Sequence, residues 1–105
     1  MDKKARGLLN YDQGLNFEVA VMQALAVIGG VQAIVIVKSR RYVELTSHVR
    51  SQLAIAERQL LPVWLVVGRQ TRRVAAALEG CVAVRDGKIL VFDPELGSFV
   101  HYRGE

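Results

Sequence analysis

The order of apolar and polar positions predicts a strand, an amphipathic helix and a second strand in the middle of the chain. Residues 34–37 read Ile-Val-Ile-Val, a β-branched run typical of a strand buried on both faces, which we place at residues 33–37. Residues 62–67 have the same character. Between them, apolar residues at spacings of four, three and four predict one buried helical stripe of Val49, Leu53, Ala56 and Leu60. Because a helix connects the two strands, we expect them to be parallel and adjacent.

Two further helices are expected on either side of this core. Asn16 can cap a helix over residues 17–28, with one buried stripe of Phe17, Val21, Ala24 and Ile28. Thr46 or Ser47 can cap the central helix in the same way. Thr71 can cap a short helix over residues 72–79, which Gly80 would close.

The C-terminal quarter has the pattern of a β meander. The Asp86-Gly87 pair is a strong signal for a two-residue hairpin turn. Residues 93–97 form a second turn. The expected short strands are residues 81–84, 89–92 and 98–102.

Together these elements predict a single α/β (α+β) domain over residues 15–105. Its mixed sheet would have a parallel βαβ core, preceded by the N-terminal helix and followed by the meander. Residues 1–14 are charged and contain glycine, and we expect an N-terminal arm there. Residues 19–37 are largely apolar, but Gly29-Gly30 interrupts them where helical periodicity gives way to a β-branched run. We therefore expect no membrane segment, and a cytoplasmic protein without a secretion signal.

Composition changes this picture in two ways. Hydrophobic residues make up 51% of the 105 residues and the mean hydropathy is +0.22, which is apolar for so small a chain. We therefore expect a homo-oligomer, a dimer formed through the edge strands of the C-terminal meander. Cys81 is the only cysteine, which excludes an internal disulfide and a cysteine-based zinc site, and we expect it to be a buried strand residue.

The charge pattern points to an anionic partner. The formal net charge is +4 and the isoelectric point is about 9.6. Two basic clusters follow the two predicted parallel strands, at the sheet edge where ligands usually bind in open α/β folds: Lys38, Arg40, Arg41 and Arg50, and then Arg69, Arg72 and Arg73. The first turns of the central helix direct His48 and Gln52 toward the same edge. We expect these residues to bind DNA or RNA, with Tyr42 and Trp64 as stacking partners, although a solvated basic surface has the same pattern.

Several positions resemble the C-terminal half of restriction-endonuclease-like toxin domains of bacterial polymorphic toxins. They are Val37-Lys38, Tyr42, Thr46, Val49-Arg50, Gln52, Ala54, Ala56, Pro62, Leu65-Val66-Val67 and the terminal Phe-Asp-Pro-Glu-Leu-Gly-Ser-Phe. The resemblance covers roughly residues 17–102. It implies a nuclease fold in which Glu18 matches the acid of the first helix and Lys38 the lysine of the acid-x-lysine motif. These two are the candidate catalytic residues.

The chain departs from this family where a metal would bind. Ile36 occupies the acid position of acid-x-lysine, and Gly29-Gly30 stands where the family has a hairpin that supplies an aspartate. Hydrolysis with a divalent ion needs converging carboxylates, and an isoleucine cannot replace an oxygen ligand. We therefore expect no metal ligands and no cofactor.

Three functions agree with these observations. The first is a nuclease-like fold without an intact metal site that binds nucleic acid or another anionic partner through its basic sheet edge. The second is a homo-oligomeric interaction or adaptor protein without a nucleic-acid role. The third is an active metal-dependent nuclease that uses Glu18, Lys38 and bound Mg²⁺ or Mn²⁺.

Overall fold

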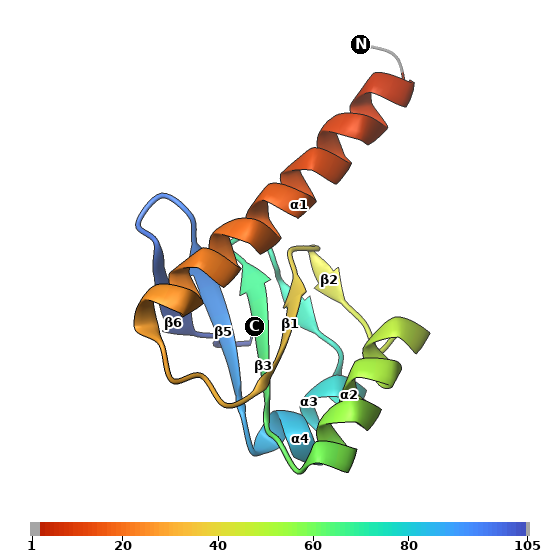
Figure 1. The fold of residues 1–105 in the computed structure, drawn as a ribbon. Helices are drawn as coiled ribbons and strands as arrows, with labels where there is room; N and C mark the ends of the chain where they lie inside the picture. Colours follow the sequence, from red (N-terminus) through yellow and green to blue (C-terminus); the bar gives the residue numbers. More distant parts are fainter. Residues whose placement is uncertain (1–2, 105) are drawn as a thin grey trace.

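The computed structural model describes the backbone of residues 3–104 and the side chains of residues 16–104. Within these residues the chain forms one α+β domain around a four-stranded mixed sheet of order β1-β3-β5-β6 (Figure 1). Two further strands, β2 and β4, pair with each other in a small second sheet. The elements are α1 (Lys3–Ile28), β1 (Ile34–Lys38), β2 (Tyr42–Val43), α2 (Ser47–Gln59), β3 (Val63–Gly68), β4 (Arg73–Val74), α3 (Ala76–Glu79), α4 (Val82–Arg85), β5 (Lys88–Asp93) and β6 (Ser98–His101).

The predicted parallel βαβ core is confirmed. β1 and β3 are neighbours and pair in parallel, with Ile36 opposite Leu65. α2 connects them and begins after Thr46, whose side-chain oxygen accepts a hydrogen bond from the backbone N–H of Val49 over 3.3 Å. This bond satisfies one of the N–H groups that a helix leaves without a partner in its first turn.

The buried stripe of α2 is as predicted except at its end. Val49, Leu53 and Ala56 are buried. The prediction that Leu60 belongs to this stripe is wrong, because Leu60 is the C-cap in the left-handed conformation, with φ of 54°. The chain leaves the helix there, and 92% of Leu60 is exposed.

Helices cover both faces of the sheet. α1 lies across one face, and α2, α3 and α4 lie on the other (Figure 1). Side chains alternate along β3, so Leu65 enters the core beneath α2 while Val66 enters the core beneath α1. Val66 is packed there with Val21 of α1 and Phe92 of β5.

The first helix is longer than predicted. α1 begins at Lys3, so Asn16 lies inside the helix and the prediction that it is the N-cap is wrong. Ile28 is 60% exposed and lies outside the buried stripe, where Leu25 is 5% exposed. The expected arm of residues 1–14 lies outside the residues whose side chains are described. No helix in the described part of the chain is both long enough and apolar enough to cross a membrane.

The segment after β3 differs from the prediction. The helix expected over residues 72–79 is wrong in its first half, because Arg73 and Val74 form β4 and pair in parallel with β2. Thr71 does not cap a helix there, and its side chain binds another loop. Only residues 76–79 are helical, with Ala75 at the N-cap position and no side-chain cap.

The strand expected at residues 81–84 is also wrong, because α4 occupies this segment. Asp86 is the C-cap of α4, so the Asp86-Gly87 pair does not form a hairpin turn. Position 87 requires glycine for another reason. A Cβ there would overlap the backbone carbonyl group of Val63 on β3, so the close approach of the two backbones leaves no room for a side chain. β5 therefore follows a helical connection and pairs in parallel with β3.

The last part of the predicted meander is confirmed. β5 and β6 are antiparallel, with Phe92 opposite Phe99. Asp93 closes the turn between them, because its side-chain oxygen accepts a hydrogen bond from the N–H of Glu95 over 2.9 Å. Gly97 completes the turn with φ of +64°, a conformation that favours glycine.

Candidate nucleic-acid interface

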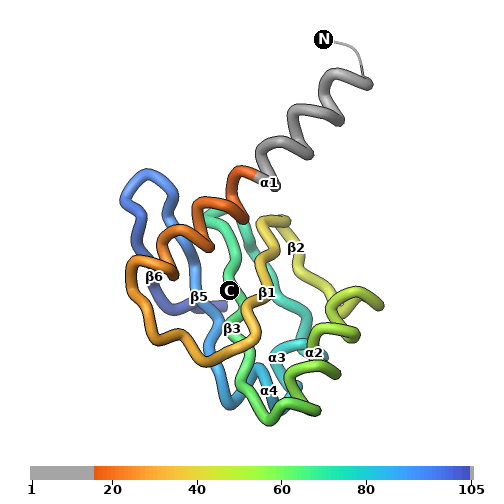
Figure 2. Tube along the Cα trace, viewed as in Figure 1, coloured from red at the N-terminus to blue at the C-terminus, as the bar shows by residue number. Residues whose placement is uncertain are grey.

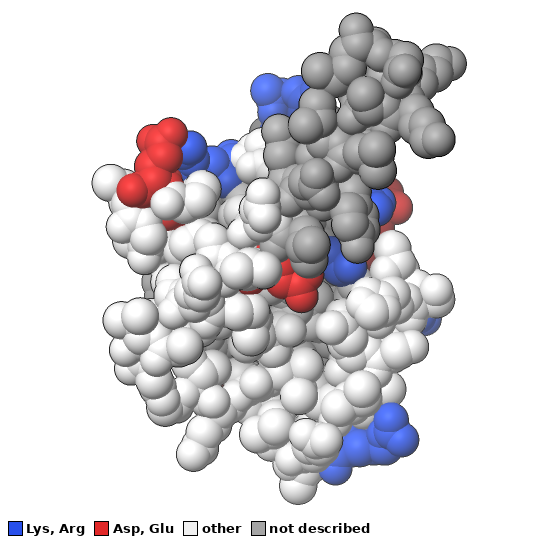
Figure 3. All heavy atoms as spheres, turned by 45° about the horizontal axis from the view of Figure 1, so that its top comes forward, with Lys and Arg blue, Asp and Glu red and all other residues white. Residues whose placement is uncertain are grey.

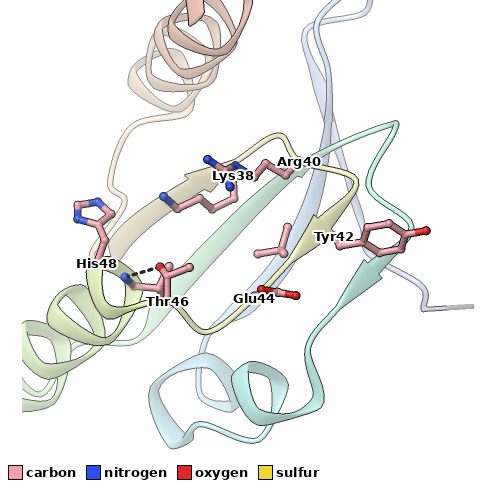
Figure 4. Close-up of a pocket in the computed structure, with 8 residues that line it drawn as sticks. Lys38, Arg40, Tyr42, Glu44, Thr46 and His48 are labelled. Atoms are coloured by element: carbon pink, nitrogen blue, oxygen red, sulfur yellow. Dashed lines mark hydrogen bonds between the residues drawn. The ribbon is translucent and has the colours of Figure 1, made fainter. Parts of the chain in front are cut away.

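A pocket of about 210 Å³ lies where β1 ends and α2 begins. It is lined by Lys38, Arg40, Tyr42, Val43, Glu44, Thr46, His48 and Val49. In Figure 4 the side chains of Lys38 and Arg40 extend from the end of β1 toward the side on which His48 lies, whereas Tyr42 points away. The structure therefore brings three of the predicted binding residues into one concave surface.

The alternation of β1 places Lys38 in this pocket. Ile36 is 1% exposed in the core beneath α2, and Lys38 follows two positions later on the same face. Lys38 pairs with Val67 near the end of the sheet and is only half-buried. Its ammonium group can therefore reach the pocket while its stem stays against the sheet.

The first turn of α2 adds further positive potential. His48 is exposed in this turn, and the cap at Thr46 fixes where the helix starts. Backbone N–H groups at the N-terminus of a helix carry partial positive charge. Lys38 and Arg40 add two positive charges to the lining of the pocket. Glu44 contributes its one carboxylate. The pocket is thus suited to an anion.

Hydrogen bonds hold a second loop against the loop that follows β1. The Thr71 hydroxyl donates to the carbonyl oxygen of Arg40 over 2.6 Å, and the Gln70 side-chain amide donates to the carbonyl oxygen of Ser39. The backbone N–H of Arg72 donates to the carbonyl oxygen of Arg41 over 2.7 Å. Figure 2 shows the two loops side by side at the C-terminal ends of β1 and β3.

This arrangement joins the two basic clusters of the sequence. Tyr42 of β2 pairs with Arg73 of β4, directly after the hydrogen-bonded loops. We name the resulting surface the basic edge and define it as Lys38, Arg40, Arg41, His48, Arg72 and Arg73. On the face shown in Figure 3, Lys and Arg atoms form separate groups, some of them beside Asp or Glu atoms.

The two predicted stacking residues lie in different places. Tyr42 is 55% exposed, and the guanidinium of Arg41 lies over its ring at 5.9 Å from the ring centre. Trp64 lies near the start of β3, on the α1 face, with the ammonium of Lys88 4.6 Å from the centre of its ring. Tyr42 therefore lies next to Arg41 of the basic edge, whereas Trp64 lies on the α1 face of the sheet.

Other predicted site residues lie outside the pocket. Arg69 is paired with Asp93 at 3.6 Å and with Glu95 at 3.5 Å, so its charge is compensated within the protein. Arg50 is exposed on α2 but does not line the pocket. Gln52 is half-buried, and its Oε1 has no hydrogen-bond partner among the described residues.

Glu18 is not brought to Lys38. It is exposed on α1, which covers one face of the sheet, whereas Lys38 shares a face with Ile36 beneath α2. Among the side chains described, no three His, Cys, Asp or Glu residues lie together as metal ligands would. Cys81 is half-buried and donates a hydrogen bond from its thiol to the carbonyl oxygen of Ala77 over 3.2 Å. It lies at the N-cap of α4 and not in a strand.

Comparison with known proteins adds no assignment, because no family model, curated protein or solved structure matches this chain. The likeness to restriction-endonuclease-like toxin domains therefore stays an expectation drawn from sequence motifs.

Proposed function

We propose that this protein binds nucleic acid, or a comparable polyanion, through the basic edge and without a catalytic metal. The main support is the hydrogen bond from Thr71 to the carbonyl oxygen of Arg40, together with the neighbouring backbone bond from Arg72 to Arg41. These bonds hold two loops that carry cationic residues next to each other, although the loops are some thirty positions apart in the chain. Repeated phosphates of a polymer would meet several of these cations at once, and each contact would release counterions.

The chemistry of the basic edge fits a flexible strand better than a single small anion. Lys38, Arg40 and His48 can contact one phosphate in the pocket, while Arg72 and Arg73 extend the positive surface beyond it. Tyr42 offers a half-exposed ring on which a base can stack. Stacking of this kind needs an unpaired base, so we expect single strands to bind more tightly than duplexes.

We propose that the protein has a nuclease-like fold without nuclease activity. Ile36 is buried in the core at the position where the resembled family has an acid. Glu18 lies on a different helix from the pocket and is not among the residues that line it. The side chains around Lys38 thus favour holding a phosphate over activating water for its hydrolysis.

Fluorescence anisotropy with labelled oligonucleotides tests the proposal. The purified protein is titrated into 20-nucleotide single and double strands of DNA and RNA at several salt concentrations. We expect affinity to fall with salt, and the Lys38→Ala/Arg40→Ala variant to bind more weakly with a salt slope smaller by about 2.

A matched control removes two cations elsewhere. Arg58 and Arg85 are exposed in the last turns of α2 and α4, away from the pocket. The Arg58→Ala/Arg85→Ala variant has the same net charge as the test variant and should keep most of the affinity. Equal losses in both variants would mean that net charge, and not the basic edge, attracts the ligand. No salt-sensitive binding by the unmodified protein would overturn the proposal.

A second candidate function is that of a homo-oligomeric interaction protein. Its support is the number of large apolar side chains at the surface, among them Val27 at 89% and Leu96 at 77% exposure. In this case the cations serve solubility, and oligonucleotide binding is absent at physiological salt. The same titration therefore separates the two candidates.

A further inference from the structure

The C-terminal half of α1 is apolar on more faces than the sheet can cover. Val21 and Leu25 are buried against the sheet. On other sides of the helix, Val19 and Met22 are each 47% exposed and Val27 is 89% exposed. A helix that is hydrophobic all round is normally covered on all sides. The outer side of α1 thus has the composition of a contact surface.

β1 is an edge strand with an apolar sequence. The sheet order is β1-β3-β5-β6, so within the described residues β1 has a ladder partner on one side only. Ile34 donates its N–H to the carbonyl oxygen of Pro62, next to β3. Because backbone groups alternate in direction along a strand, the N–H and C=O groups of Val35 and Val37 point away from β3. Edge strands are commonly protected by charges or proline, and here Lys38 at the end is the one such residue of β1.

These two features adjoin each other. A groove of about 350 Å³ is lined by Met22, Leu25, Ala26, Gly29, Gly30, Val31, Ala33 and Val35. The groove therefore connects an exposed side of α1 with the strand whose outer edge is open.

We propose that a second copy of this chain docks here, with β1 of the two copies antiparallel about a two-fold axis. A second copy supplies both things that the surface lacks, namely a strand with unpaired backbone groups and an apolar helix beside it. A two-fold contact uses one patch twice, which requires a self-complementary surface. The result is a continuous eight-stranded sheet flanked by two α1 helices.

The charge distribution supports a second copy as the occupant. The chain has a net charge of +4, so most contacts between copies would bring like charges together. Residues 19–37 contain no charged side chain, and they include the last ten residues of α1 and all of β1 except Lys38. This stretch is where two copies can meet without that repulsion. From the sequence, the dimer surface is expected at the C-terminal meander, whose strand β6 is the other edge of the sheet, and the hydrogen-exchange experiment below distinguishes β1 from β6.

Light scattering after size exclusion tests the oligomeric state at roughly 50 μM, where a micromolar dimer is largely associated. We expect the unmodified protein to have twice the 11.6 kDa mass of one chain. Met22→Glu and, separately, Ala26→Glu should each give the mass of one chain, because a two-fold contact would bury two like charges. Circular dichroism verifies that each variant is folded.

Leu60→Glu is the matched control. Leu60 is 92% exposed at the end of α2 and does not line the groove, so this variant should have the mass of the unmodified protein. Amide hydrogen exchange supplies the second readout: Val35 and Val37 should exchange at least tenfold more slowly in the dimer than in the Met22→Glu monomer. A monomeric unmodified protein, a dimer that survives both groove substitutions, or protection of β6 in place of β1 would each overturn the proposal.

Discussion

The hydroxyl group of Thr71 lies 2.6 Å from the carbonyl oxygen of Arg40, a residue 31 positions earlier in the chain. This hydrogen bond connects the loop after β3 to the loop after β1, and therefore one basic cluster to the other. The short strands β2 and β4 begin immediately after the two linked loops. The positions of the cations in the basic edge thus depend on Thr71, a side chain without charge.

Thr71→Val should weaken nucleic-acid binding although no cation is removed. The substitution keeps the shape of the side chain and deletes the hydroxyl donor, which leaves the Arg40 carbonyl without this partner. We expect a loss of about 1 kcal/mol in the free energy of unfolding, typical of one hydrogen bond. We also expect a loss of roughly threefold in affinity, because the loops no longer hold the cations in place. Urea denaturation and anisotropy measure the two effects.

Ser51→Ala is the control for this substitution. The Ser51 hydroxyl also donates to a backbone carbonyl, that of Ser47 at 3.1 Å, but it does so on the exposed surface of α2. Affinity should not change in this variant. If Thr71→Val binds as tightly as the unmodified protein, the hydrogen bond does not organise the binding surface.

Removing the two negative charges that pair with Arg69 should strengthen the binding of nucleic acid. Gly68 is opposite Phe92 in the sheet, so Arg69 and Asp93 follow at neighbouring positions, and their side chains pair at 3.6 Å. The Asp93→Asn/Glu95→Gln variant retains the shape of both partners and removes their charge. We expect affinity for single-stranded DNA to rise by roughly threefold at low salt, and the gain to vanish as salt screens it.

Net charge alone would also raise affinity, so this experiment needs a matched variant. Glu57 and Glu79 are exposed on α2 and α3 and do not line the pocket at the end of β1. Glu57→Gln/Glu79→Gln adds the same two units of charge at a distance from Arg69. A gain of equal size in both variants would show that Arg69 itself does not reach the ligand.

Gly87→Ala should destabilise the fold strongly. A Cβ at this position would overlap the carbonyl group of Val63 where β5 begins beside β3. The strands would have to separate, at a cost of about 3 kcal/mol in the free energy of unfolding. Urea denaturation measures the loss. Gly104→Ala is the control, because its nearest neighbour would be the Tyr102 ring at 3.8 Å, an ordinary contact.

The sequence predicts the parts of this fold that local patterns determine. The β-branched run of β1 and the spacing of Val49, Leu53 and Ala56 on α2 each follow from one short stretch, and both elements are confirmed. The position of Lys38 beside His48 also follows, because strand alternation and helix capping fix the two side chains separately. To predict that Lys38 and His48 lie together, one has to assume only that β1, α2 and β3 form a parallel βαβ unit.

Long-range pairing explains what the sequence misses. β2 and β4 are two residues each and have no pattern of their own, since each exists through pairing with a segment some thirty residues away. Thr71 has the properties of a helix cap, but its hydroxyl has a partner in another loop. Gly87 resembles a turn residue because close approach of two strands and a hairpin both favour glycine. The pairing of Arg69 could not be expected without knowing that β5 lies next to β3.

Binding of nucleic acid should not require a divalent ion, and no cleavage should accompany it. Ile36 is 1% exposed in the hydrophobic core, so the position that would carry a metal-binding acid is filled by packed hydrocarbon. The pocket beyond it is lined by one carboxylate, that of Glu44, together with Lys38 and Arg40, whose positive charges repel a divalent ion. We expect affinity in EDTA to be at least as high as in magnesium, because Mg²⁺ competes for the phosphates, and we expect intact DNA and RNA after incubation with Mg²⁺ or Mn²⁺. Glu18→Ala and Lys38→Ala, purified in parallel, identify contaminating nucleases: metal-dependent cleavage that both substitutions abolish would restore the active nuclease that the motif resemblance implies.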